Sequence, residues 1–296
     1  MRFTLRQLGY FVAVAEANTL AQAAAQLNVS QPSVSVAISN LEIDLGVQLF
    51  VRHHARGVSL TPSGKRLLPE AQSLLRHADE FQTGVMEVSS GVSGNLTIGC
   101  FVTIAAMYMP KLITGFTRQH PGTSISLTEG NLDEITKGLQ SSVFELALAY
   151  DLGLPASIHF ELLSHATPYA LLPRRHKLAR QAEVSLSDLC NEPLILLDIP
   201  PSRNYFPALF STENLSPKIG LSSPSFEVVR GMVGQGAGYS LLVTKPQSDF
   251  TYDGSKVISK PIAGDIQSTN IGLAWQQGLR PTRLMSAFVD YCRETI

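Results

Sequence analysis

The stretch from Ser30 to Glu42, SQPSVSVAISNLE, constrains the fold of this chain more than any other segment. Ser30 is a good helix N-cap because its hydroxyl can accept a hydrogen bond from a backbone N–H group of the first turn, and Pro32 suits that turn. The opposite face has short, uncharged side chains, so this helix can approach another surface closely. Apolar residues at spacings of four, three and four predict one buried stripe, formed by Val34, Ile38, Leu41 and Leu45.

A second short helix is predicted directly before this one, with a stripe of small apolar residues formed by Leu20, Ala23, Ala24 and Leu27. Two short helices that pack through alanines and are joined by a tight connection have the pattern of a helix-turn-helix, whose second helix enters the DNA major groove. The same pattern also occurs in ordinary helical cores, so the helix pair alone leaves both interpretations open. For the DNA interpretation, we expect base contacts from the start of the second helix, namely Gln31, Pro32, Ser33 and Ser35.

The segment after this helix predicts a β-wing. Two short strand-like pieces, Leu49–Arg52 and Gly57–Leu60, flank the polar residues His53–Arg56. In such a hairpin, Arg52 and Arg56 can reach DNA phosphates or the minor groove. The whole chain has a net charge of −1, but residues 1–66 carry +3 and the remaining 230 residues carry −4. This asymmetry fits a small basic DNA-binding head on a larger acidic body.

A long helix is predicted from Pro62 to about Ser89, with Thr61 as its N-cap. Its apolar residues alternate spacings of four and three, which is the pattern of a coiled-coil seam. A long stripe of apolar side chains exposed to water is unfavourable, so we expect this helix to form a dimer through the stripe. The residues of the predicted seam are Leu67, Ala71, Leu74, Ala78, Phe81 and Val85. Gly91 and Gly94 mark a hinge into the next domain.

From Asn95 onward, strands and helices are predicted to alternate, which indicates a parallel α/β sheet with right-handed crossovers. The chain is expected to cross into a second lobe and to return before the final helix. We place lobe I at about 91–163 and 268–296, and lobe II at about 164–267. Two α/β lobes joined by two crossings form a cleft, and ligands sit at the carboxyl ends of such strands.

Several classes of function find no support in the sequence. Cys100, Cys190 and Cys292 are far apart and odd in number, which is typical of a reduced, cytoplasmic protein. No run approaches the ~20 apolar residues of a membrane span, and the seven histidines are scattered. The glycine-rich stretch 234–238 follows a predicted helix and precedes a strand, which reverses the order of a dinucleotide fingerprint. We therefore expect no membrane association, no metal, no cofactor and no enzymatic activity.

Together, the helix pair, the wing segment LGVQLFVRHHARGVSLTPSG and the heptad linker resemble LysR-type transcriptional regulators. LTIG at 96–99 and SFEVVRGMVGQGAGYSLLV at 225–243 match the body of that family, so the resemblance covers essentially all 296 residues. It implies an all-α winged helix-turn-helix domain, a linker helix and a two-lobed α/β effector domain like a periplasmic binding protein. It also implies a cytoplasmic bacterial regulator, commonly a homotetramer built as a dimer of dimers.

The partners that this resemblance implies are double-stranded DNA with an interrupted palindrome, a small-molecule effector and RNA polymerase. The chain departs from the family pattern in its second helix. Where the family often has arginine after the recognition-helix serine, this chain has Ser35–Val36, and Ala21 stands where serine or threonine is frequent. A guanidinium that could pair with guanine is therefore absent, and Val36 can at most touch a thymine methyl group.

The resemblance also indicates where an effector binds. Thr103, four residues after Gly99, matches a hydroxyl of the family's pocket, Asn131 matches a second pocket position, and residues 200–203 match the edge from the second lobe. These positions lie near predicted helix N-termini, which favour anions, so a small carboxylate fits best. The alternative is that Thr103, Asn131 and Ser202 are only helix caps. The full set expected at the effector site is Cys100, Thr103, Asn131, Pro201, Ser202 and Arg203.

The sequence thus predicts three parts: a DNA-binding domain at 1–61, a dimerisation helix at 62–90 and an effector domain at 91–296. The function expected of such a chain is sequence-specific transcriptional regulation controlled by a small effector between the lobes. One alternative stays open, which is a small-molecule-binding protein or enzyme on the two-lobed fold. In that case the N-terminal helices would serve only for oligomerisation.

Overall fold

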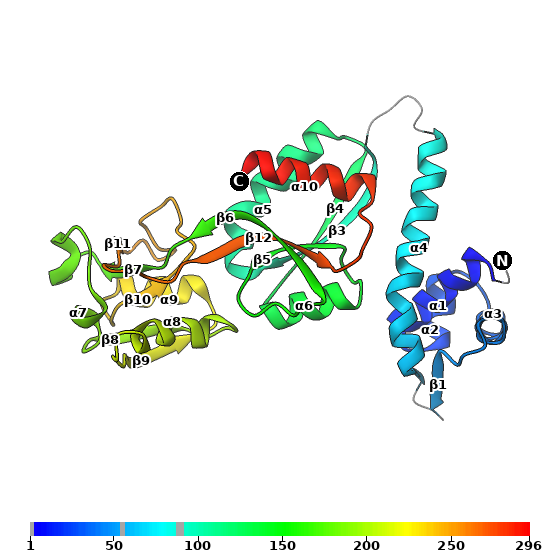
Figure 1. The fold of residues 1–296 in the computed structure, drawn as a ribbon, viewed down its shortest axis with the longest axis horizontal. Helices are drawn as coiled ribbons and strands as arrows, with labels where there is room; N and C mark the ends of the chain where they lie inside the picture. The colour runs from blue at the N-terminus through cyan, green and yellow to red at the C-terminus, as the bar shows by residue number, and fades with distance from the viewer. Residues whose placement is uncertain (1–2, 54–56, 87–91) are drawn as a thin grey trace.

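The computed structural model describes residues 3–53, 57–86 and 92–296, and it contains a helical head, a long helix and a two-lobed α/β body (Figure 1). The predicted N-cap Ser30 is confirmed, and Thr19 caps the second helix in the same way, since each side chain accepts a hydrogen bond from a first-turn N–H group. The third helix ends at Gly46, whose φ of 67° is readily adopted by glycine. The head comprises α1 (Leu5–Ala17), α2 (Leu20–Gln26), α3 (Gln31–Leu45), β1 (Phe50–His53) and β2 (Gly57–Leu60).

The head has its own hydrophobic core, in which Val14, Val34 and Leu41 are fully buried. The rings of Phe11 and Phe50 pack edge to face in this core, with centroids 5.5 Å apart. Each such buried side chain stabilises the fold by about 1.5–3 kcal/mol relative to its exposed state. The predicted wing is confirmed as an antiparallel hairpin with Phe50 opposite Leu60. The core therefore holds α3 and the hairpin in one rigid unit.

The long helix α4 (Pro62–Met86) begins at Thr61, whose hydroxyl accepts a hydrogen bond from Gly64 N. The heptad pattern of α4 does not show which apolar side chains pack against the head and which remain exposed. Ala71 is buried in the head's own core, which corrects its place in the predicted seam, while Leu74 and Phe81 are exposed. On the same helix, Arg76 Nε lies 3.4 Å from the Glu145 carboxylate of the body. This ion pair connects the long helix to lobe I.

Lobe I is built on a five-stranded sheet of order β4-β3-β5-β12-β6. The expectation of a parallel sheet is only partly right, because β3 is parallel to β4 and β5, whereas β12 is antiparallel to β5 and β6. Figure 1 shows α5 and α10 on one side of this sheet and α6 on the other. The elements are β3 (Gly94–Phe101), α5 (Val102–Gln119), β4 (Thr123–Gly130), α6 (Leu132–Gln140), β5 (Leu146–Tyr150), β6 (Ile158–Ala166), β12 (Thr269–Gln276) and α10 (Arg283–Thr295).

Lobe II contains an antiparallel sheet of order β10-β7-β11 and a parallel pair, β8-β9. Both crossings between the lobes run through long strands, β6 outward and β12 on the return (Figure 1). The sequence did not indicate β6 or β11 as strands. The elements of lobe II are β7 (Tyr169–Pro173), η1 (Lys177–Arg180), α7 (Leu186–Leu189), β8 (Pro193–Leu197), α8 (Ser202–Ser211), β9 (Lys218–Ser223), α9 (Phe226–Gly234), β10 (Ser240–Leu242) and β11 (Val257–Pro261).

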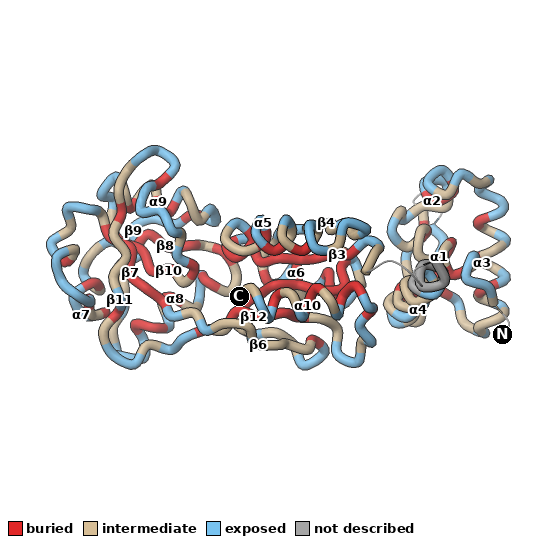
Figure 2. Tube along the Cα trace, turned by 90° about the horizontal axis from the view of Figure 1, so that it is seen from above, coloured by how far each residue is buried: buried red, intermediate tan, exposed pale blue. Residues whose placement is uncertain are grey.

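Burial follows these layers, with buried strands inside each lobe and exposed helix faces around them (Figure 2). The buried residues of the two lobes form one contiguous hydrophobic cluster, and those of the head form a second. Within the part of the chain that the structure describes, no helix is long and apolar enough to cross a membrane. The head and the body therefore each have a core of their own, joined through α4.

Candidate functional site

The first candidate site is the exposed face of α3. Val34, Ile38 and Leu41 point into the head's core, and this leaves the opposite face open to solvent. Along that face, Val36 is 58% exposed and Ile43 is 76% exposed. Side chains this apolar and this exposed are unusual on a helix whose other face is already buried. The face is therefore a surface available to a partner.

The structure places the four predicted base-contacting residues at the start of this helix. Gln31, Pro32 and Ser33 are exposed, while Ser35 is half-buried. The hydroxyl of Ser33 lies 2.7 Å from that of Ser30, and Ser33 N donates to the Ser30 hydroxyl. The Ser33 hydroxyl is therefore already engaged in the helix cap.

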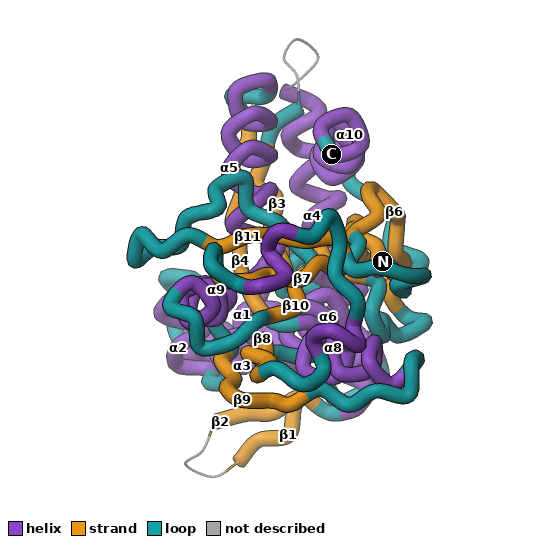
Figure 3. The backbone as a smooth tube through the Cα atoms, turned by 90° about the vertical axis from the view of Figure 1, so that its left-hand side faces the viewer, coloured by secondary structure: helices purple, strands orange, loops and turns teal. Residues whose placement is uncertain are grey.

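The β1–β2 hairpin projects from the head (Figure 3). Arg52 Nη2 donates a hydrogen bond to the Ser39 hydroxyl of α3 at 3.1 Å. At the outer end of the strands, the His53 ring and the Ser59 hydroxyl are 2.7 Å apart. The second predicted phosphate contact, Arg56, lies outside the described residues. The wing and the exposed face of α3 thus form one continuous surface.

The second candidate site is a small cavity between the two lobes of the body. Its volume is about 10 Å³, which is room for about one water molecule. The side chains around it are hydroxylic or apolar, and none of them carries a formal charge at neutral pH. The lining residues are Thr103, Tyr150, Leu152, Leu197, Ser202, Tyr205, Phe226, Leu242, Val243, Thr244 and Thr269.

A chain of hydroxyl groups crosses from one lobe to the other at this cavity. The Tyr150 hydroxyl lies 3.4 Å from the Thr103 hydroxyl in lobe I and 3.2 Å from the Thr244 hydroxyl in lobe II. Burial raises the pKa of Tyr150, although its hydrogen bonds with the two threonines act in the opposite direction. Tyr150 therefore remains a neutral phenol that can donate one hydrogen bond and accept another.

Two helices begin at the cavity without a side-chain cap. The N-cap residues of α5 and α8 are Phe101 and Pro201, and neither makes a side-chain capping hydrogen bond. Thr103 and Ser202 lie in the first turns of these helices and line the cavity. Ser202 is only 8% exposed, and its hydroxyl makes no hydrogen bond to another described residue. The first-turn N–H groups of Arg203 and Asn204 already donate to backbone carbonyl oxygens. The positive ends of two helix dipoles and the Ser202 hydroxyl therefore meet at one place.

Of the six residues predicted at the effector site, Thr103 and Ser202 line the cavity, and the other four do not. Cys100 is fully buried in lobe I, where burial raises the pKa of its thiol. The Asn131 side chain accepts a hydrogen bond from Glu134 N and caps α6. Its strand, β4, is the sheet edge and is separated from β5 by β3. The structure therefore shows Asn131 as a helix cap, which was the alternative interpretation of this residue.

The remaining two predicted residues lie at the start of α8. Pro201 is the N-cap of this helix. The Arg203 guanidinium forms an ion pair with the carboxylate of Asp198, and its side chain is about half exposed. Arg203 therefore faces solvent beside the cavity rather than lining it.

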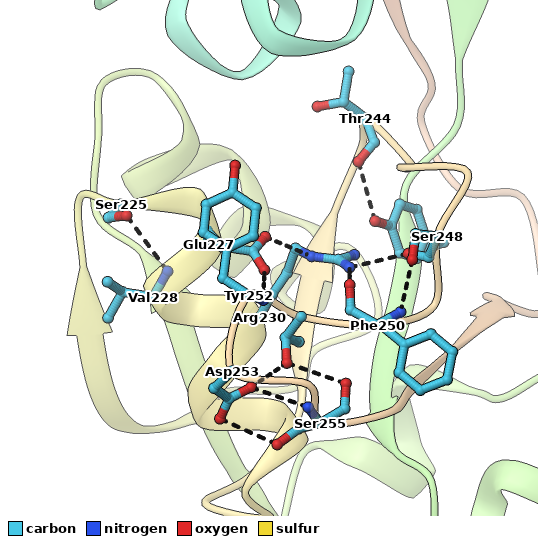
Figure 4. A network of polar contacts seen from close by, with 12 residues as sticks. Ser225, Glu227, Val228, Arg230, Thr244, Ser248, Phe250, Tyr252, Asp253 and Ser255 are labelled. Atoms are coloured by element: carbon cyan, nitrogen blue, oxygen red, sulfur yellow. Dashed lines mark hydrogen bonds and ion pairs between the residues drawn. The ribbon is translucent and has the colours of Figure 1, made fainter.

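Sequence reasoning missed Tyr150 and the residues that position Thr244. Tyr150 ends a strand that the sequence did indicate, so its place at a carboxyl end was a usable signal. Arg230 of α9 is 2% exposed, and Figure 4 shows how it holds the loop after β10. Its guanidinium contacts the Glu227 carboxylate at 2.9 Å and donates to the carbonyl oxygens of Ser248 and Phe250. An arginine and a glutamate three residues apart in a mainly apolar helical segment were the available signal.

The start of the same loop, at Thr244, is also held by a hydrogen bond. The Tyr169 hydroxyl donates to the Thr244 carbonyl oxygen at 3.0 Å. Thr244 is therefore held from both its backbone and its hydroxyl, which fixes one wall of the cavity. Across residues 3–53, 57–86 and 92–296, no group of three or more histidine, cysteine or acidic side chains is arranged to hold a metal ion.

Comparisons with known proteins agree with this two-site arrangement. Residues 5–65 match the family described as bacterial regulatory helix-turn-helix protein, lysR family, and residues 89–296 match the LysR substrate binding domain. The regulator CfxR of Cupriavidus necator is 32% identical over 247 residues, which is 81% of this chain and 75% of CfxR.

Two solved structures from Pseudomonas aeruginosa are similar over almost their whole length. HinK, a LysR family transcriptional regulator, is 47% identical with a TM-score of 0.67, and the match covers 99% of this chain and 98% of HinK. The PA01 protein, a putative LysR family regulator, is 46% identical with a TM-score of 0.68 and coverage of 100% and 99%. With its helix-turn-helix head, its wing and its two-lobed body, the chain belongs to the LysR family of transcriptional regulators.

Proposed function

We propose that this regulator binds specific DNA sequences under the control of a small carboxylate held between its two lobes. The observation that carries the effector class is the convergence of two uncapped helix N-termini, those of α5 and α8, on one cavity. The positive ends of the two helix dipoles favour a negative charge there. The unpartnered hydroxyl of Ser202 supplies a further hydrogen-bond donor.

The charges around the cavity support the same effector class. None of the lining side chains is acidic. The Asp151 carboxylate accepts a hydrogen bond from the lining hydroxyl of Thr269, and Asn270 donates two further hydrogen bonds to it. Arg203 is paired with Asp198 and is not needed for this proposal. A carboxylate bound here is held by backbone N–H groups and hydroxyls, and burial strengthens each of these hydrogen bonds.

The small size of the cavity bears on how an effector would act. A volume of about 10 Å³ is too small for a carboxylate-bearing molecule, so binding requires the lobes to separate. An effector that binds only the more open arrangement shifts the population toward it. Glu145 of lobe I forms an ion pair with Arg76 of α4. A movement of the lobes can therefore be transmitted through α4 to the head.

We infer that α4 forms a dimer through the part of the predicted seam that its own head leaves free. Phe81 is 76% exposed, and Leu74 is also exposed on this helix. Two heads held together would read two half-sites, which is why an interrupted palindrome is expected. A dimer of dimers, cytoplasmic localisation and an interaction with RNA polymerase belong to the same proposal.

Calorimetry tests the effector class directly. The full-length protein is titrated with a panel of small carboxylates and with amines of matched shape. We expect a carboxylate to bind, and we expect Thr103→Val or Ser202→Ala to weaken its affinity about 10-fold, because a buried hydrogen bond to a charged group is lost. Ser211→Ala, which changes an exposed serine at the far end of α8, is the matched control. Binding of amines alone, or unchanged affinity in both cavity variants, would contradict the proposal.

A further inference from the structure

We propose that Val36 determines base specificity, by selecting thymine through contact with its methyl group. This inference rests on the proposed sequence-specific DNA binding and names the residue and the base. It begins from the position of Val36 on α3. The buried stripe of that helix contains Val34, Ile38 and Leu41, and Val36 projects from the opposite side with 58% of its surface exposed.

The neighbours of Val36 leave its side chain uncovered. One turn before it, the Ser33 hydroxyl is engaged with Ser30, and nearly one turn after it, the Ser39 hydroxyl accepts from Arg52. These polar side chains are short and already hydrogen-bonded, so they do not cover the isopropyl group. The rotamer of a valine in a helix is nearly fixed. The chain therefore presents one rigid apolar group in the middle of this face.

Base chemistry makes thymine the preferred partner of such a group. In the major groove, thymine is the one base that exposes a methyl group, while the other bases present only polar edges there. Valine can neither donate nor accept a hydrogen bond. Against another base it would cover polar atoms without replacing their bonds to water, which carries a free-energy penalty. The same side chain thus attracts thymine and disfavours its competitors.

A second exposed apolar residue on α3 provides a matched control. Ile43 is 76% exposed on the same side of the helix but lies about two turns further toward its C-terminus. Base edges are contacted by the N-terminal part of the recognition helix. Ile43→Ala therefore removes a comparable apolar side chain without removing the thymine contact.

The first experiment selects DNA duplexes from a random library with the purified full-length protein. The wild type and Ile43→Ala should enrich the same half-site, with thymine at one position that loses its preference in Val36→Ala. In Val36→Arg, that position should change to guanine, because a guanidinium pairs with the O6 and N7 atoms of guanine. An unchanged preference in both Val36 variants would overturn the proposal. If the wild type enriches no sequence at all, the proposed DNA-binding function itself fails.

The second experiment removes only the methyl group. Replacing that thymine by deoxyuridine in the selected duplex should weaken wild-type binding about fourfold per half-site, which is the effect of losing one buried methyl group. Val36→Ala should bind both duplexes about equally, whereas Ile43→Ala should keep the fourfold difference. Equal wild-type affinity for the two duplexes, or a full fourfold difference in Val36→Ala, would contradict the assignment.

Discussion

The hydroxyl of Tyr150 connects the two lobes at the cavity, because it contacts the Thr103 hydroxyl in lobe I and the Thr244 hydroxyl in lobe II. Both threonines are almost fully buried. A buried hydroxyl that loses its partner costs about 1–3 kcal/mol. The polar lining therefore contributes to the stability of the fold.

Tyr150→Phe is expected to lower the free energy of unfolding by about 1–3 kcal/mol, because it leaves two buried threonine hydroxyls without this partner. Denaturant unfolding of the full-length protein measures the change. Tyr252→Phe is the control, since Tyr252 is almost fully exposed and its loss should change stability by less than about 0.5 kcal/mol. Equal stability of Tyr150→Phe and the wild type would show that the hydroxyl chain contributes nothing to the fold.

At this scale the sequence predicted part of the site. The family resemblance placed Thr103 and Ser202 near helix N-termini at an effector site, and both residues line the cavity between the lobes. Asn131 fits the same local pattern, but its strand lies at the sheet edge, and strand order depends on contacts distant in sequence. Arg230 was missed because its partners, the carbonyl groups of Ser248 and Phe250, lie about 20 residues away.

Among the elements, α4 shows the limit of a periodic pattern. A stripe of apolar residues indicates that a helix face is buried, but it does not say whether the covering surface belongs to the same chain. Leu68 and Ala71 are covered by the protein's own head, whereas Phe81 is not. The boundaries of α3 and the wing, by contrast, were predicted closely because caps, glycine and turn residues are local signals.

Phe81→Asp should convert the dimer to monomers, because it places a charge in the exposed part of the α4 seam. Sedimentation velocity of the full-length protein at micromolar concentration measures the change. Glu70→Ala is the matched control, since Glu70 is exposed on the same helix outside the predicted seam. A dimer that persists in Phe81→Asp would place the interface elsewhere on the molecule.

The wing gives a second prediction at the level of elements. Arg52 lies beside α3 and is expected to contact a DNA phosphate. Arg52→Ala should weaken binding to all DNA sequences alike and should reduce the slope of log affinity against log salt by about 0.9. Binding titrations at four salt concentrations measure both effects. A change in sequence preference with an unchanged slope would show that Arg52 contacts a base instead.

For the whole molecule, the sequence indicated two lobes and two crossings, and the structure has both. It did not indicate the strand β6 or the antiparallel direction of β12, because strand direction depends on how the chain returns between lobes rather than on local composition. The ion pair of Arg76 and Glu145 is also a long-range feature that connects α4 to lobe I. The proposed coupling between cavity and head therefore depends on contacts that no local motif encodes.

The most direct test of the central claim is a fluorescence anisotropy titration of the full-length protein at a fixed salt concentration. One labelled duplex comes from the region upstream of the protein's own coding sequence, and the other is a scrambled duplex of equal composition. We predict binding to the upstream duplex that is tighter by about a thousandfold or more, with an affinity that changes when a carboxylate effector is added. Equal affinity for both duplexes would contradict sequence-specific regulation and favour a small-molecule binder or enzyme whose head serves only for oligomerisation.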